Sequence, residues 1–285
     1  MINSKIVSLQ EGYTLSKNAR NLFINRNNRA LLIYSQYAKQ NAQSLYKLAY
    51  TYLDSPSNEI DKGFNYFTKD EIILFNDTLA NVINQCRDEW IGDVNPYEII
   101  EDEKKRKKCT LCKQKNKLIF HIKNQFNGMK MNVGSKCITA FHSLEYPSGL
   151  TKAEVMRRAH RQSRIQSLTL KFPGIEKIVS SWESELEKYH VLIPEFLENK
   201  YLDIGSELKE IYNNYLKRRV GKADIKKISK LLKSRDSFLS NMRDYETENK
   251  LKDYVVTRKI VKWLQLKNDY ETIKHIKKLV MSLLI

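Results

Sequence analysis

Apolar residues recur every three or four positions through most of the chain, which is the period of an α-helix. In the N-terminal third, this spacing predicts one amphipathic helix from Ala30 to Leu53, which ends before Ser55-Pro56. Later in the chain, it predicts a basic helix that starts at Thr151, a helix over 175–190 and long helices from Ser206 onward. We therefore expect a mainly α protein with helical-bundle-like parts.

A second N-terminal helix has a sequence signature at its start. Thr68 and Glu71 have the spacing of a capping box, so we expect this helix to begin at Thr68 and to run toward Trp90. Cys86 lies on its apolar stripe, which predicts a buried core thiol. Metal ligation is the alternative for Cys86, because it lies 23 residues before Cys109.

The hydrophobic pattern changes to strand-like alternation in the middle of the chain. The segments LIFHI and MNVG flank Asn127-Gly128, and Asn-Gly between two such runs predicts a β-hairpin. Gly134-Ser135 then leads to a short helix that we expect to begin near Cys137. A small β-hairpin element is thus predicted between two helical parts.

Composition excludes several classes of protein. The chain has 285 residues with 41% hydrophobic content, which excludes an intrinsically disordered protein. No apolar run reaches the about 18–20 residues that a membrane span needs. The N-terminus lacks the apolar segment of a signal peptide. We expect a soluble cytoplasmic protein with no membrane partner.

Charge divides the chain into three parts. Residues 1–103 hold 10 Lys and Arg against 14 Asp and Glu, a net charge of −4 within an overall +17. Residues 104–204 and 205–285 carry net charges of +11 and +10. We predict an acidic helical domain over 1–103, a basic metal-binding module over 104–150 and a basic helical domain over 151–285. The basic balance favours an acidic partner such as nucleic acid.

Three of the four cysteines have metal-ligand spacing. Cys109 and Cys112 form a C-x2-C pair, and Cys137 follows the predicted hairpin. A C-x2-C turn presents two thiolates to one ion, and zinc prefers four tetrahedral nitrogen or sulfur ligands. No Asp or Glu occurs from 104 to 144 to assist a catalytic metal. The cofactor is therefore predicted to be a structural Zn²⁺.

The chain order of a C-x2-C turn (the zinc knuckle), a β-hairpin and a helix resembles a treble-clef zinc finger. That family commonly carries a glycine after the first knuckle, where this chain has Lys113, and takes a second helical ligand where this chain has Ala140. The C-x2-C pair, the hairpin and the ending Val133-Gly134-Ser135-Lys136-Cys137-Ile138-Thr139-Ala140-Phe141 also resemble small proteins of phages and mobile elements. That resemblance implies a phage or mobile-element origin and no specific activity.

Two histidines, His121 and His142, are candidates for the fourth zinc ligand. If Asn127 and Gly128 are the two loop residues, Phe126 pairs with Met129, and His121 faces Gly134 at the open end of the hairpin beside Cys137. His142 lies five residues beyond Cys137, about 140° around a helix. We favour His121, with His142, Cys86, water or another group as alternatives.

Basic side chains crowd the predicted zinc module and the helix after Thr151. Lysines of this density can neutralise several phosphates, and an arginine-rich helix suits a DNA groove. No pattern of exposed aromatics for stacking bases is evident near the zinc, so DNA is favoured over RNA. The residues expected to bind nucleic acid are Lys104, Lys105, Arg106, Lys107, Lys108, Lys113, Lys115, Lys117, Lys123, Lys130, Lys136, Arg157, Arg158, Arg161 and Arg164.

The leading hypothesis is a non-catalytic, zinc-containing nucleic-acid-binding protein whose residues 1–103 self-associate or bind a protein partner. A phage or mobile-element effector that binds and inhibits a host protein is the alternative. A metal-dependent nuclease or recombinase is a third hypothesis, which would use Asp93 and Glu103. The chain has no P-loop, G-x-G-x-x-G or G-x-S-x-G motif, so we do not expect an enzyme.

Overall fold

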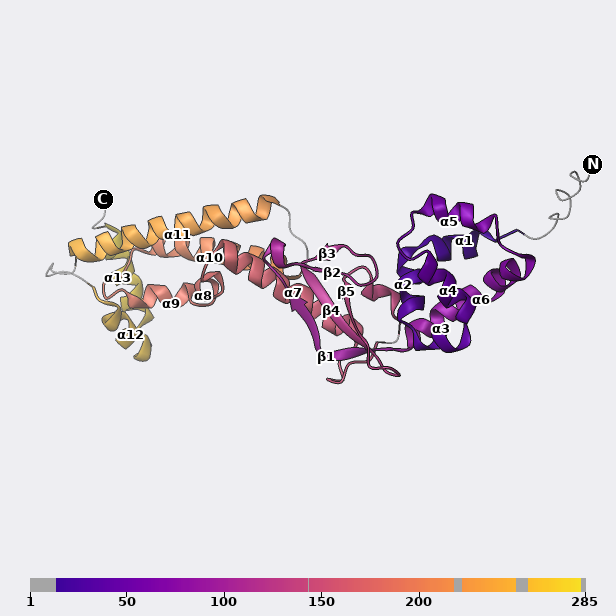
Figure 1. The fold of residues 1–285 in the computed structure, drawn as a ribbon. Helices are drawn as coiled ribbons and strands as arrows, with labels where there is room; N and C mark the ends of the chain where they lie inside the picture. The colour runs from indigo at the N-terminus through magenta and orange to yellow at the C-terminus, as the bar shows by residue number, and fades with distance from the viewer. Residues whose placement is uncertain (1–13, 143, 218–221, 250–255, 283–285) are drawn as a thin grey trace, which may run out of the picture. The chain divides into compact units, whose positions relative to one another are not determined.

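The fold is mainly helical, with a small antiparallel sheet (Figure 1). This computed structural model describes residues 14–142, 144–217, 222–249 and 256–282. The chain divides into two compact units, Met1–Ser163 and Arg164–Ile285, and the boundary falls inside the helix α7 (Lys152–Lys171). One buried cluster of the first unit contains residues from Ala19 to Ala159, so residues 1–103 and 104–150 share a core.

The N-terminal part of the first unit consists of short helices. The prediction of one helix from Ala30 to Leu53 is wrong, because the chain bends at Ser35 and again at Ala42. Ser35 has an extended backbone and its side chain accepts a hydrogen bond from the Ala38 N–H, so it starts a new helix. The helices before α6 are α1 (Lys17–Ile24), α2 (Arg26–Tyr34), α3 (Gln36–Asn41), α4 (Gln43–Thr51) and α5 (Ser57–Phe64).

The longest helix of the first unit, α6 (Lys69–Asp88), begins as predicted. Thr68 and Glu71 form a capping box in which each side chain bonds the other residue's backbone N–H. Cys86 is fully buried on the core-facing side, as predicted. Burial raises the pKa of its thiol to about 12.

The sheet has the strand order β1-β4-β5, with β1 (Trp90–Ile99), β4 (Leu118–Asn124) and β5 (Lys130–Gly134) all antiparallel. Sequence analysis did not predict β1, in which an irregularity between Gly92 and Tyr97 interrupts the pairing with β4. A second ladder joins β2 (Lys107–Lys108) to β3 (Lys115–Asn116). A short 3₁₀ turn, η1 (Glu103–Lys105), lies between β1 and β2, and another, η2 (Ile138–Ala140), follows β5 in place of the predicted short helix.

The predicted β4–β5 hairpin is present, but its predicted register is wrong. His121 pairs with Asn132 and not with Gly134, which pairs with Ile119. The Asn124 side chain accepts hydrogen bonds from the Phe126 N–H at 2.9 Å and the Asn127 N–H at 3.2 Å. These bonds stabilise a loop over 125–128, which is two residues longer than the Asn-Gly turn requires.

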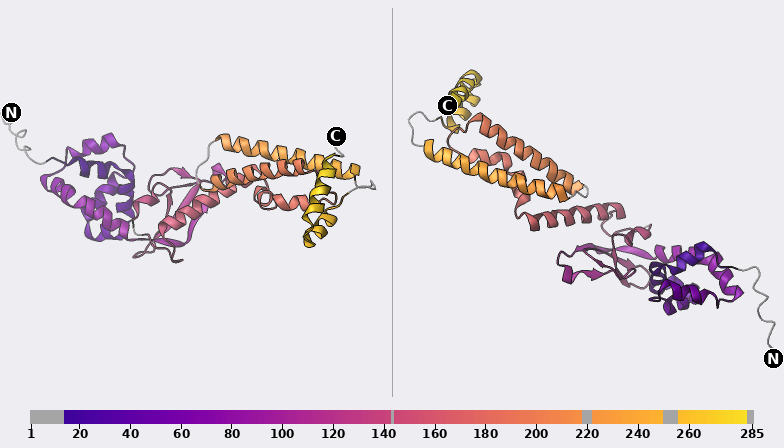
Figure 2. Two further views of the ribbon diagram at one scale, coloured as in Figure 1. Left: turned by 180° about the vertical axis from the view of Figure 1, so that it is seen from behind. Right: turned by 90° about the horizontal axis from the view of Figure 1, so that it is seen from above.

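The second unit is helical in its described residues. Its longest helices, α10 (Glu195–Lys217) and α11 (Lys222–Asn249), run side by side (Figure 2) and bury Leu208, Ile228 and Met242 between them. The single helix expected over 175–190 is divided into α8 (Ile175–Ser180), α9 (Trp182–Glu185) and η3 (Leu186–Lys188). The last two helices are α12 (Arg258–Leu266) and α13 (Tyr270–Ser282). No helix of the described residues is long and apolar enough to cross a bilayer.

Candidate metal centre

Cys109, Cys112 and Cys137 come together in the first unit. Their sulfur atoms all lie within 4.8 Å of one another, and none of the three forms a disulfide. Cys109 and Cys137 are buried, and Cys112 is half-buried. The prediction that these cysteines form one group is confirmed, and the group is able to hold a metal ion.

The turn that carries Cys109 and Cys112 is closed by the β2–β3 ladder. The Cys109 N–H donates to the Gln114 carbonyl, and the Lys113 N–H donates to the Cys109 carbonyl, each at 2.9 Å. Lys113 has a φ of 61°, the left-handed conformation in which glycine is favoured. This backbone reversal directs both thiols to the same side of the turn.

Hydrogen bonds attach the turn to β5, close to Cys137. The Thr110 N–H donates to the Asn132 carbonyl at 2.7 Å, and the Asn132 N–H donates to the Thr110 hydroxyl at 3.2 Å. Gly134 lies under the Asn116 side chain, whose amide oxygen would be 2.7 Å from an added Cβ. A glycine at this position therefore lets β3 and β5 approach closely, which brings Cys137 to the other two cysteines.

The surroundings of the Cys109 sulfur favour negative charge on it. The Cys137 thiol and the backbone N–H groups of Cys112, Gly134 and Leu111 donate hydrogen bonds to the Cys109 sulfur, which lowers the pKa of Cys109. The pKa of Cys137 is raised, because this thiol holds the proton that it donates to Cys109. A bound cation would replace that proton and relieve the repulsion between the thiolates.

Helix α2 also contacts this centre, a contact that was not expected from the sequence. The Asn27 side-chain amide lies 3.6 Å from the Cys137 sulfur. Arg26 donates to the Leu111 carbonyl in the cysteine turn and forms a 2.8 Å ion pair with Asp54. The first turn of α2 thus packs against the cysteines. No local sequence signal marks Asn27, because it lies 110 residues from Cys137.

The structure does not bring either candidate histidine to the cysteines. The His121 Nδ1 atom lies 2.8 Å from the Asn132 side-chain oxygen, and its Nε2 atom lies 3.7 Å from Glu98. His142 is exposed, and Cys86 is buried on α6. Among the described residues, the only His, Cys, Asp or Glu side chains that form such a group are the three cysteines. The choice of His121 as fourth ligand is therefore corrected, because it rested on the wrong hairpin register.

Many of the basic residues expected to bind nucleic acid form ion pairs instead. The segment 104–144 has no acidic residue, but β1 and the loop after it place five carboxylates beside the module. These carboxylates neutralise part of the predicted basic surface. The pairs are Lys105–Asp102 at 3.9 Å, Arg106–Glu103 at 3.0 Å, Lys107–Glu98 at 2.6 Å, Lys117–Glu101 at 2.7 Å and Lys130–Asp93 at 2.8 Å.

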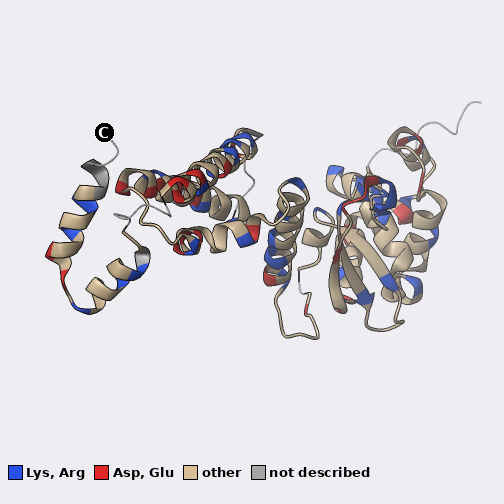
Figure 3. Cartoon of the chain, turned by 90° about the vertical axis from the view of Figure 1, so that its left-hand side faces the viewer, with Lys and Arg blue, Asp and Glu red and all other residues tan. Residues whose placement is uncertain are grey.

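The remaining lysines of the module are exposed. In the described part of the chain, no ion pair forms with Lys104, Lys108, Lys115, Lys123 or Lys136, while Lys113 lies near Asp54. Lys108 and Lys115 are direct partners in the β2–β3 ladder. On α7, Arg157, Arg158 and Arg161 are exposed and Arg164 is half-buried; Figure 3 shows how blue basic and red acidic residues are distributed over the elements.

The two carboxylates of the nuclease hypothesis each form an ion pair with a different basic residue. Asp93 lies on β1 with only 11% of its side chain exposed, and the hydrogen bond from Lys130 lowers its pKa. Glu103 pairs with Arg106. Within the described residues, these carboxylates are not part of a group that could hold a metal ion.

Comparisons of the chain with protein-family models, with curated proteins and with solved structures each found no match.

Proposed function

We propose that this protein binds nucleic acid, with duplex DNA as the preferred target, through a basic module folded around a structural zinc ion. One observation carries the proposal. Lys108 and Lys115 face each other across the β2–β3 ladder directly beside Cys109, exposed and with no ion-pair partner among the described residues. Like charges directly opposite each other destabilise a sheet, so a bound anion would relieve the repulsion between these two ammonium groups. A phosphate backbone supplies such anions at regular spacing.

The chemistry of the cysteine group supports zinc. Thiolates are soft ligands that suit Zn²⁺, and tetrahedral sites with several cysteines are typical of structural zinc. Hydrogen bonds attach the cysteine turn to β5 and to α2, so the ion would hold the lysine-bearing ladder in place. We propose a non-catalytic role for the metal, since no carboxylate or histidine of the described residues joins the group.

Aromatic exposure supports duplex DNA over a single strand. Of the aromatic residues in 104–142, Phe120 and Phe141 are buried, and Phe126 at the hairpin tip is exposed. Modules that bind single strands stack successive bases on several exposed aromatics. One exposed phenylalanine offers a single such position.

The test is fluorescence anisotropy with labelled duplex DNA, single-stranded DNA and RNA over a series of salt concentrations. We expect Lys108→Gln/Lys115→Gln to bind duplex DNA about tenfold more weakly and to reduce the salt slope by about 2, one for each lost phosphate contact. The matched control is Lys107→Gln/Lys130→Gln, which removes the same charge from lysines already paired with Glu98 and Asp93. The control is expected to lose much less affinity.

Two results would contradict the proposal. If both double variants lose the same affinity for duplex DNA, net charge, and not the Lys108–Lys115 pair, determines binding. Absence of binding to all three nucleic acids at low salt would exclude the proposed function, and the alternative of an effector that inhibits a host protein would then be tested by capture of protein partners.

A further inference from the structure

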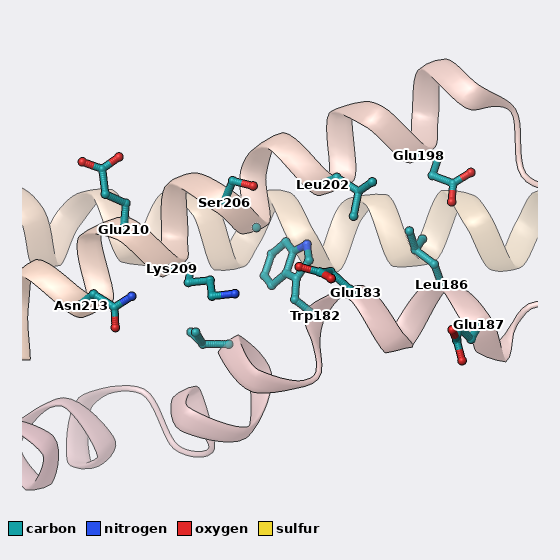
Figure 4. Close-up of a pocket in the computed structure, with 12 residues that line it drawn as sticks. Trp182, Glu183, Leu186, Glu187, Glu198, Leu202, Ser206, Lys209, Glu210 and Asn213 are labelled. Atoms are coloured by element: carbon teal, nitrogen blue, oxygen red, sulfur yellow. The ribbon is translucent and has the colours of Figure 1, made fainter.

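The second unit contains a groove that is lined mainly by acidic residues, although the chain as a whole has a net positive charge. It has a volume of about 680 Å³ and lies between α10 and the α8–α9–η3 segment. Figure 4 shows Glu198 and Glu210 on α10, with Glu183 and Glu187 on the opposite wall. Lys209 is the one basic residue among those that line the groove. Glu187 pairs with Lys262 of the helix α12 (Arg258–Leu266) at 3.9 Å, and the other three carboxylates still outnumber the ammonium group of Lys209.

The groove also has an apolar floor. Leu202 on α10 and Leu186 on the other wall lie near each other, and the Trp182 ring lies to one side of them (Figure 4). The Trp182 indole N–H donates to the Tyr201 carbonyl at 2.9 Å, which fixes the ring against α10. The groove therefore suits an occupant that is both apolar and basic.

Helix α12 presents such a surface. Its side chains Ile260, Trp263 and Leu266 are 45%, 57% and 83% exposed, which is unusual for large apolar residues grouped on one helix. Lys259 lies four positions before Trp263 on the same face, and Lys267 lies at its edge. Both lysines are exposed and form no ion pair among the described residues.

The exposed and the buried residues of α12 lie on different faces of the helix. Val261 and Leu264 are buried in a small cluster with Leu192 and Ile273. The Leu192 N–H donates to the Val256 carbonyl at 2.8 Å, which holds the chain just before α12 against the segment that follows η3. Turning Trp263 toward the groove of the same chain would expose Val261 and Leu264. The groove therefore remains available to another molecule.

We propose that two copies of this chain associate, with the exposed Lys259–Trp263–Leu266 face of α12 from one copy in the acidic groove of the other. The apolar side chains would cover the half-buried Val179 and Leu202, and the lysines would pair with glutamates on the groove walls. If the contact is reciprocal, a two-fold dimer buries it twice. This association is independent of nucleic-acid binding, and it places self-association in the second unit and not in residues 1–103.

The test is sedimentation velocity of the full chain, freed of nucleic acid, over a range of concentrations. One variant reverses the groove with Glu183→Lys/Glu210→Lys, and a second reverses the helix with Lys259→Glu/Lys267→Glu. We expect wild type to dimerise and each variant alone to dimerise at least tenfold more weakly. An equimolar mixture of the two variants should recover dimers, because each reversed surface then meets its complement.

Recovery in the mixture also shows that both variants are folded, since a misfolded protein would not regain a partner. Trp263→Ser is expected to weaken wild-type association without changing its salt dependence. A monomeric wild type at every concentration, dimers that persist in both charge-reversed variants, or a mixture that stays monomeric would each overturn the proposal.

Discussion

Lys113 holds the cysteine turn in a conformation that is costly for a residue with a Cβ. Its φ of 61° places it in the left-handed region, where an L-residue other than glycine pays about 1–2 kcal/mol. Its ammonium group lies near Asp54, which provides some electrostatic compensation. The glycine common after the first knuckle of treble-clef proteins would avoid the backbone cost.

We predict that Lys113→Gly is more stable than Lys113→Gln by about 1 kcal/mol, because both changes remove the charge and only glycine removes the strain. Urea unfolding of the metal-loaded protein, followed by circular dichroism, measures the difference. Lys115→Gly, in the adjacent β3 strand, is expected to destabilise the protein. Equal stability of the glycine and glutamine variants at position 113 would show that the turn is not strained.

At the scale of the elements, the two ends of α6 are held in different ways. At its start, Thr68 and Glu71 form an exposed capping box, with the Thr68 N–H bonded to Glu71 at 2.8 Å. At its end, the Glu89 carboxylate is 1% exposed. It accepts hydrogen bonds from the Gln36 N–H at 3.0 Å and the Asn124 amide at 2.7 Å. Glu89 therefore joins α6 to the start of α3 and to the β4–β5 hairpin.

We predict that Thr68→Ala lowers the free energy of unfolding by about 1 kcal/mol. Glu89→Ala should lower the free energy of unfolding by about 3 kcal/mol or more, because it leaves the N–H groups of Gln36 and Tyr37 on α3 and the Asn124 amide on β4 without their acceptor. Denaturant unfolding with both variants, made in the same helix, gives the comparison. If Glu89→Ala lowers the free energy of unfolding no more than Thr68→Ala does, water replaces the carboxylate at this junction.

At the scale of the whole molecule, the candidate metal centre belongs to only one of the two cores. The first unit's buried cluster includes Cys109 and Cys137, whereas the second unit is built around α10 and α11 and contains no cysteine. Units with separate cores can unfold in separate transitions. Metal binding should therefore stabilise the first unit alone.

We predict that chelation, or Cys109→Ser/Cys137→Ser, lowers the melting temperature of the first unit by about 10 °C and leaves the transition of the second unit unchanged. Metal content measured by mass spectrometry should fall in the cysteine variant and stay constant in His121→Ala. Loss of metal from His121→Ala would restore that histidine as a ligand. A chelator that shifts both transitions, or neither, would contradict the assignment of the metal to this core.

Structural features that depend on residues close together in the chain were predicted from the sequence alone. The capping box at Thr68 needs residues only three positions apart, and the Cys109–Cys112 turn needs a similar span. The hairpin follows from a turn between two apolar segments, although Asn124 lengthens its loop and changes the register. The mainly helical class was predictable for the same reason, and the grouping of Cys137 with the first two cysteines followed from the predicted hairpin that joins them. Zinc and nucleic-acid binding stay predictions.

Only the tertiary structure decided the features that depend on residues distant in the chain. Strand β1 is defined by its pairing with β4, and its own sequence alternates too irregularly to predict it. That pairing brings acidic residues beside the lysines of the module, so charge counted along the sequence overstates the free basic surface. Asn27 reaches Cys137 across 110 residues for the same reason. Local hydrogen bonds and periodicity are encoded in short segments, whereas ion pairs, strand partners and ligand geometry arise when packing joins those segments.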